Sequence, residues 1–316
     1  MNTGFFSHPE CRLHEMGSGH PECPERLDAI VDHLLATGLL DTLEQPEVPQ
    51  ASLADLELAH SRMHIAAVQG LQQRLEAEEM AGGPSHFYID PDTAMNAYSW
   101  DAALRAAGAA IAATDAVIDG RLANAFCAVR PPGHHAMREK AMGFCLFNNI
   151  AIAAKHALER RGLKRVAVVD FDVHHGNGTE DILQNDPRCM MVGIFQHPFY
   201  PYSGENSAAT NMLNLPVPAY TRGTEVREVF EQLLFPRLDA FQPEMIFISA
   251  GFDAHRDDDL GQMGLVEADY AWLTEQISQI AKRHAKGRIV SCLEGGYNLN
   301  ALARSVHAHV KALAQL

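Results

Sequence analysis

Residues 165–179 have the sequence RVAVVDFDVHHGNGT. The run 165–170 is apolar and β-branched and ends in a carboxylate, which predicts a buried strand. Four more short apolar runs predict strands of the same kind, at residues 125–129, 189–194, 245–250 and 288–293. Continuous apolar strands are typical of a parallel sheet that is covered on both faces.

Helical patterns separate these strands. Residues 24–36 begin with proline and place apolar side chains on one face, at Leu27, Ile30, Val31 and Leu34. Further helices are expected at 100–118, 148–160, 225–235, 267–284 and 301–313, and structured loops at 81–95 and 198–219. The alternation of strands and helices predicts an α/β fold, and because no Gly/Ser-rich or Pro-rich linker divides the chain, we expect a single domain over residues 1–316.

The composition is that of a globular protein with an acidic surface. Hydrophobic residues make up 47% of the chain and charged residues 21%, and the formal net charge is −15. This charge opposes binding to nucleic acid through phosphate contacts. It would attract cationic substrates, although acidity alone commonly reflects solubility. The 17 histidines are the one unusual count, and they direct attention to metal chemistry.

Cysteine usage and hydropathy bear on the compartment. The 6 cysteines include no CxxC pair, which predicts free thiols in a reducing environment. The chain shows no secretory signal and no apolar run near the roughly 20 residues that span a bilayer. We therefore expect a soluble, cytoplasmic protein with no membrane partner.

Polar residues follow four of the predicted strands directly. In chain order these strand ends lead into His134 and His135, into Asp170, Asp172 and His174, into Asp253, and into Tyr297. Ligands of a parallel sheet bind beyond the carboxyl ends of its strands. We therefore expect these side chains to form one site.

The segment after the quoted strand is a candidate metal site. Asp170, Asp172 and His174 share one face of an extended chain, and a divalent cation such as zinc would relieve the repulsion of the two carboxylates. The alternative is a solvated acidic turn followed by surface histidines. Asp253 can supply a third ligand or be a helix N-cap or turn residue, and Asp170 can orient the ligands. Three protein ligands leave a position for water, as in catalytic zinc sites.

The other strand ends offer groups for proton transfer. His134 and His135 are candidates for the general base and acid, although neighbouring histidines are often incidental. Tyr297 follows two glycines, and its hydroxyl could stabilise a developing oxyanion. A GGY turn of purely structural origin is the alternative.

Six motifs together resemble the zinc-dependent histone deacetylase superfamily, and most closely its class II and bacterial amidohydrolase branch. They are HPECPERL from His20, RPPGHHA from Arg130, GFC from Gly143, DFDVHHGNGT from Asp170, GFDAH from Gly251 and EGGY from Glu294. The resemblance covers nearly the whole chain. It implies the arginase/deacetylase fold, with a central eight-stranded parallel sheet flanked by helices.

The resemblance also implies roles for the strand-end residues. It implies one zinc ion on Asp172, His174 and Asp253. It pairs His134 with Asp170, and His135 with Asn177. Class I relatives have aspartate at the position of Asn177, so the charged form of His135 should be less favoured here.

Further residues of the channel follow from the same resemblance. Gly143 and Phe144 match its floor and one wall, Tyr200 matches the opposite wall, and Arg26 matches an arginine near its inner end. Relatives often hold a structural potassium ion with carbonyl groups of the DxDxH segment and a serine on the next strand. Gly193 stands at that serine position, which weakens the predicted potassium site without removing its backbone ligands.

The implied reaction is hydrolysis of an N-acetylated amine to acetate and a free amine. The expected substrate is acetyl-lysine in proteins or peptides, because Leu260 stands where polyamine-specific relatives have glutamate. The alternatives are a deacetylase of acetylpolyamines or other small amines, and an inactive metal-binding interaction module. If small cations are the substrate, the run 257–259, Glu15 and Glu22 are the carboxylates to consider. Oligomerisation is compatible with the sequence but not indicated by it.

Overall fold

A parallel sheet forms the centre of the computed structural model, which describes residues 2–207 and 209–316. Within those residues the sheet has seven strands in the order β1-β4-β9-β8-β5-β6-β7. They are β1 (Thr3–Phe6), β4 (Asn124–Cys127), β5 (Val166–Asp170), β6 (Cys189–Gln196), β7 (Met212–Val217), β8 (Met245–Ala250) and β9 (Ile289–Leu293). All five strands expected from the sequence are confirmed. The implied count of eight strands is wrong by one for the described part of the chain.

The two strands that sequence analysis missed lie at the edges of the sheet. β1 has only four residues. β7 lies inside the segment 198–219, which was expected to be a loop, and it carries Pro216 opposite Phe195 of β6. Proline cannot donate a ladder hydrogen bond, so it is confined to edge strands, where it hides the strand signal. The prediction of a loop there is therefore wrong for residues 212–217.

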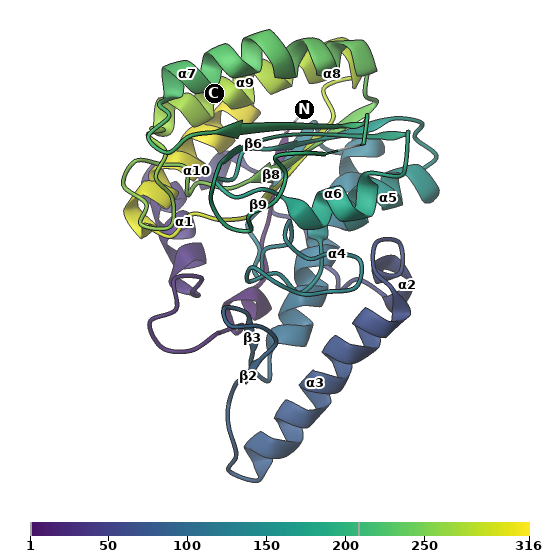
Figure 1. Ribbon diagram of the computed structural model, residues 1–316, viewed down its shortest axis with the longest axis vertical. Coiled ribbons are helices and arrows are strands. Elements are labelled where there is room, and N and C mark those ends of the chain that lie inside the picture. The colour runs from purple at the N-terminus through teal and green to yellow at the C-terminus, as the bar shows by residue number, and fades with distance from the viewer. Residues whose placement is uncertain (1, 208) are drawn as a thin grey trace.

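Helices cover both faces of the sheet (Figure 1). On one side lie α9 (Glu267–His284), α10 (Leu299–Ala314) and the continuous segment α7 (Gly223–Val229), η3 (Phe230–Leu234, a π-helical turn) and α8 (Phe235–Phe241), with α1 (Glu25–Ala36) packed against α10. On the other side lie α4 (Ser99–Ile118), α5 (Asn149–Glu159) and α6 (Asn177–Leu183). The six predicted helices are confirmed, and the one expected at 225–235 extends to Phe241. No described helix is long and apolar enough to span a bilayer.

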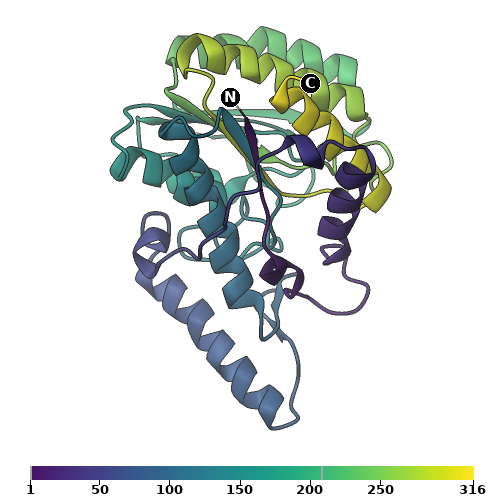
Figure 2. The ribbon, with the colours of Figure 1, turned by 180° about the vertical axis from the view of Figure 1, so that it is seen from behind.

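One part of the chain extends away from the sheet. Figures 1 and 2 show α3 (Arg62–Met80) and the small antiparallel pair β2 (Phe87–Tyr88) and β3 (Ala94–Met95) reaching beyond the two helical layers. The buried positions of α3 include polar His64 and Gln72, so its apolar stripe is weak, and sequence analysis did not predict it. The expected loop at 81–95 contains the β2–β3 pair. Short elements complete the fold: η1 (Pro9–Arg12), η2 (Leu40–Thr42) and α2 (Leu53–Leu56).

Candidate metal centre and active site

The predicted strand-end residues converge because their strands are neighbours. The loops that carry them follow β4, β9, β8 and β5, which are adjacent in the sheet in that order. All four strands are parallel, so these loops leave the same edge of the sheet. This arrangement puts the polar clusters of four distant sequence segments into one place.

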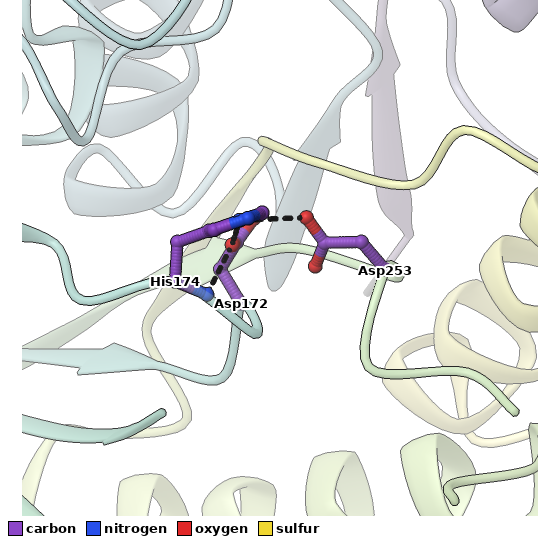
Figure 3. Close-up of side chains that lie close together, drawn as sticks. All are labelled: Asp172, His174 and Asp253. Carbon is purple, nitrogen blue, oxygen red and sulfur yellow. Dashed lines mark hydrogen bonds and ion pairs between the residues drawn. The ribbon is translucent and has the colours of Figure 1, made fainter. Parts of the chain in front are cut away.

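Asp172, His174 and Asp253 form a compact set of metal-ligand groups (Figure 3). One ligand atom from each lies within 4.8 Å of the others. His174 Nδ1 is 3.0 Å from Asp172 Oδ1 and 3.2 Å from Asp253 Oδ2. Both carboxylates are buried, and apart from its ion pair with His174, Asp253 Oδ2 has no hydrogen-bond partner among the described residues.

This donor set fits a divalent cation. Two buried carboxylates and one imidazole match the ligands that zinc accepts, and a cation would bind the Asp253 oxygen that accepts no hydrogen bond. Burial and the neighbouring charge of Asp172 raise the pKa of Asp253 to about 7, a penalty that a bound cation would remove. Backbone groups orient both carboxylates: Gly295 N donates to Asp172 Oδ2 at 2.8 Å, and Val173 N donates to Asp253 Oδ1 at 3.0 Å.

His134 and His135 lie beside this set in different environments. Their ring centroids are 4.0 Å apart. His134 Nδ1 is 3.1 Å from Asp170 Oδ2. Burial lowers the pKa of His134, but the charges of Asp172 and Asp170 outweigh burial and raise it to about 10. Burial and the charge of His134 hold the pKa of His135 well below its ordinary value. Two adjacent titratable groups with pKa values displaced in opposite directions are typical of acid–base sites.

The partner of His135 determines its tautomer. His135 Nδ1 is 2.7 Å from Asn177 Oδ1. An amide oxygen only accepts, so neutral His135 carries its proton on Nδ1 and leaves Nε2 as a free acceptor. Asn177 therefore suits a histidine that acts as a base.

A cavity of about 430 Å³ opens above these groups. Its lining includes the predicted residues His135, Gly143, Phe144, His174, Tyr200, Leu260 and Tyr297. The Tyr200 ring meets His135 edge-on at 5.3 Å, and the Phe144 ring meets Tyr297 in the same way at 5.8 Å. Gly143 has φ +58°, and a Cβ there would lie 2.4 Å from His135 Cδ2, so the floor requires glycine.

Five further residues line the cavity, and of these only Asp259 was considered from the sequence, as part of the run 257–259. They are His20, Pro21, Asp92, Phe199 and Asp259. Phe199 stacks on the ring of His174, with centroids 5.4 Å apart and planes 17° apart, so Phe199 and Tyr200 of the loop after β6 both form the wall. Most of the remainder lie in irregular loops, for which periodicity gives no signal.

Arg26 lies beneath Tyr297, fully buried. Its guanidinium is 4.9 Å from the centroid of the Tyr297 ring, and its Nε donates to Gly296 O at 2.7 Å. Glu22, which was considered as a substrate-binding carboxylate, is also fully buried and pairs with Arg26 and Arg130 at 3.1 and 2.8 Å. The suggestion that Glu22 contacts a substrate cation is therefore wrong, because its charge is already matched below the site.

Glu294 is a site residue whose role was not predicted from the sequence, where it appears only as the first residue of the EGGY motif. Its Oε2 accepts from Gly133 N at 2.7 Å and from His134 N at 3.1 Å, and Ser249 Oγ donates to its Oε1 at 3.1 Å. Glu294 thus links the loop that carries His134 and His135 to β8 through hydrogen bonds. A carboxylate at the end of an apolar strand, the same pattern as Asp170, was the available signal.

Gly193 lies where the resemblance expected it. It pairs with Asp170 across β5 and β6, and a Cβ at Gly193 would lie 3.7 Å from Asp170 O. Gly193 therefore offers no side-chain ligand at this point, and a potassium ion there stays a prediction.

Comparisons with known proteins identify the family of this chain. The family model of the histone deacetylase domain matches residues 20–313. A probable deacetylase of Archaeoglobus fulgidus is 36% identical over 307 residues, covering 95% of this chain and 82% of the relative. Polyamine deacetylase HDAC10 of Mus musculus is 38% identical over 324 residues, covering 98% and 46%. The crystal structure of the HDA15 HD domain matches with a TM-score of 0.91 at 33% identity, covering 99% of this chain and 90% of that chain.

Fold and site together define a metal-dependent hydrolase of acetylated amides. The chain belongs to the histone deacetylase family. The chain spans between 21% and 95% of the length of the curated relatives that it matches.

Proposed function

We propose that this protein is a zinc-dependent deacetylase whose substrate is acetyl-lysine in proteins or peptides. One observation carries the proposal: a metal-ligand triad and two adjacent histidines, one beside Asp170 and one beside Asn177, lie at the base of an aromatic-walled cavity. The depth and aromatic walls suit an unbranched alkyl chain that ends in a small acyl group.

A zinc ion held by Asp172, His174 and Asp253 would supply Lewis-acid activation of the acetyl carbonyl and of a water molecule. His135 Nε2, free of a proton because Nδ1–H faces Asn177, accepts the proton of the attacking water. Like burial, the charge of protonated His134, which lies beside Asp170, lowers the pKa of His135. The Tyr297 hydroxyl donates a hydrogen bond to the developing oxyanion. A protonated histidine then gives its proton to the leaving amine, and acetate and the free amine leave.

The residue at the cavity mouth supports acetyl-lysine. Leu260 lines the cavity and offers no charge to a distal ammonium group of a substrate. A lysine side chain has no such group beyond its acetylated nitrogen. An apolar mouth residue therefore favours a substrate that is neutral along its chain.

A second candidate substrate is an acetylpolyamine. Two carboxylates, Asp92 and Asp259, also line the cavity, and the chain carries a net charge of −15. Both would attract a polycation. One of the relatives carries the name polyamine deacetylase.

The deciding experiment compares kcat/KM for acetyl-lysine peptides and acetylpolyamines on one zinc-loaded preparation, with acetate release as the readout. The Asp172→Ala protein serves as the control for contaminating activity. We expect the acetyl-lysine peptide to be the better substrate. A strong preference for acetylpolyamines would transfer the assignment to the second candidate. No acetate from any acetylated amine at full zinc occupancy would overturn the deacetylase proposal and favour a metal-binding interaction module.

A further inference from the structure

Asp258 is a buried carboxylate in the loop between β8 and α9. It is 5% exposed, whereas its neighbours Asp257 and Asp259 are exposed. Its side chain points toward the chain that follows β9. Among the three consecutive aspartates, Asp258 alone is thus turned away from solvent, which calls for a physical reason.

The reason is a set of three backbone hydrogen bonds. Asp258 Oδ2 accepts from Tyr297 N at 2.6 Å and from Asn298 N at 2.9 Å, and its Oδ1 accepts from Leu260 N at 3.0 Å. Tyr297 and Leu260 both line the cavity. One carboxylate therefore fixes the backbone of two residues on the wall of the site.

The peptide group before Tyr297 is held at both of its polar atoms. Its carbonyl oxygen, on Gly296, accepts from Arg26 Nε at 2.7 Å, and its N–H donates to Asp258. Gly296 has φ +120°, in a region that glycine enters without the penalty of a side chain. A Gly-Gly sequence leaves the backbone intrinsically free, so these two contacts fix the peptide group that carries Tyr297.

We propose that Asp258 is a positioning residue for Tyr297: it holds the Tyr297 backbone so that the hydroxyl meets the oxyanion. The same carboxylate holds the backbone of Leu260 at the cavity mouth. This inference rests on the proposed deacetylase chemistry. The effect on rate follows because a catalytic donor displaced by about 1 Å can lose up to ~100-fold in rate.

The test is a double-mutant cycle of Asp258→Ala and Tyr297→Phe in the zinc-loaded protein. Asp258→Ala alone should lower kcat by about 10- to 100-fold, less than the ~10²–10³-fold expected for loss of the hydroxyl itself. KM should change by less than about threefold, because the oxyanion contact strengthens only in the transition state. In the Tyr297→Phe background, Asp258→Ala should have almost no further effect, since the group that it positions is gone.

Two more variants keep the test decisive. Asp257→Ala removes an equal charge from the same loop and should leave kcat within about twofold of wild type. Asp258→Asn retains one carbonyl oxygen that can accept from both Tyr297 N and Asn298 N, so it should recover most of the lost kcat. If Asp258→Ala does not fold, the cycle is run with Asp258→Leu, which keeps a side chain of similar size but accepts no hydrogen bond.

The outcomes separate the two proposals. Inactive wild-type protein contradicts the proposed chemistry, whereas a Tyr297→Phe variant with normal kcat in an active protein contradicts the positioning role, because no catalytic hydroxyl would be left to position. An active wild type in which Asp258 and Tyr297 effects multiply independently overturns the positioning role alone. A loss of kcat that the Asp257→Ala variant reproduces would do the same, because it would reflect charge and not hydrogen bonding.

Discussion

The floor and the rim of the cavity are built by different physical means. The floor consists of buried charged or polar side chains on loops that leave the sheet directly, and each is oriented by a partner, as His135 is by Asn177 and Asp172 by Gly295. The rim includes His20 and Asp92, from segments remote from those strand ends, and Asp259, which lies further along the same loop as Asp253. Asp92 and Asp259 are exposed, whereas the metal-ligand carboxylates are buried.

This contrast predicts where substitutions act. Electrostatic interactions are strong where water is excluded and weak where it is present. Changes on the floor should therefore abolish metal binding or catalysis, whereas changes at the rim should shift substrate preference by small factors. The predictions below test this division, beginning with the largest effect.

Removal of a metal ligand should have the largest effect. Asp172→Ala, His174→Ala or Asp253→Ala should each remove stoichiometric zinc and lower kcat/KM by at least about 10³-fold, since Lewis-acid activation is worth several kcal/mol. Metal analysis of the gel-filtered proteins, together with acetate release, gives the answer. Asp170→Asn is the matched control: it should reduce activity more than metal content, because Asp170 contacts His134. Full zinc in any ligand variant contradicts the assignment.

Loss of the Tyr297 hydroxyl should come next. Tyr297→Phe keeps the ring that contacts Phe144 and Arg26 and removes only the oxygen. The expected loss in kcat is about 10²–10³-fold, with little change in KM. Steady-state kinetics on an acetyl-lysine peptide measure both. A near-normal kcat would remove Tyr297 from the mechanism and weaken the idea that floor residues act on the chemical step.

The floor was accessible from the strand pattern of the sequence, whereas the rim residues His20 and Asp92 were not, for a physical reason. Parallel strands are buried on both faces, so RVAVVD and MIFISA stand out as apolar runs, and the polar residues after them mark the sheet edge. The cavity mouth depends on how loops distant in sequence pack. Asp92 reaches the cavity beside the β2–β3 pair, in a segment expected to be only a loop, and nothing in its spacing indicates that contact.

The same reason explains the errors about acidic residues. Glu22 and Asp258 were grouped with possible substrate-binding carboxylates because the sequence shows their charge but not their partners. In the structure the partners are two arginines for Glu22 and three backbone N–H groups for Asp258. The direction in which an acidic side chain points depends on tertiary contacts that no local pattern encodes.

The buried charges beneath the floor should matter for stability. Burial alone would raise the pKa of Glu22, but the charges of Arg130 and Arg26 outweigh it and lower the pKa to about 2. A lowered pKa of a carboxyl group means that its ionised form stabilises the fold above the ordinary pKa near 4.5, and that this contribution is lost as pH falls toward 2. Glu22→Gln should therefore destabilise the protein by about 3 kcal/mol at pH 7, because it leaves two buried arginines short of a charge.

Chemical denaturation of the wild-type and Glu22→Gln proteins at pH 7.5 and at pH 3.5 measures the contribution of the Glu22 charge to stability. The difference in unfolding free energy between wild type and Glu22→Gln should shrink at the lower pH. Exposed Glu25 supplies the control, and Glu25→Gln should change stability by no more than about 0.5 kcal/mol. A pH-independent difference would show that hydrogen bonding, and not the charge of Glu22, supports the floor.

The smallest effect should come from charge at the rim. Leu260→Glu would place a third carboxylate at a mouth that already has Asp92 and Asp259. Exposed ion pairs contribute about 0.2–1 kcal/mol after screening and side-chain entropy are included. The ratio of kcat/KM for an acetylpolyamine to that for an acetyl-lysine peptide should therefore rise by about 10-fold or less. The shift should diminish as salt concentration increases.

Leu260→Gln, which has the shape of the Leu260→Glu side chain but no charge, should leave the ratio almost unchanged. If the wild type already prefers acetylpolyamines and Leu260→Glu does not alter the ratio, recognition depends on the existing carboxylates, and Asp92→Asn and Asp259→Asn should then reduce it. A shift of 100-fold or more would mean that the mouth excludes water as the floor does, and the division between floor and rim would fail.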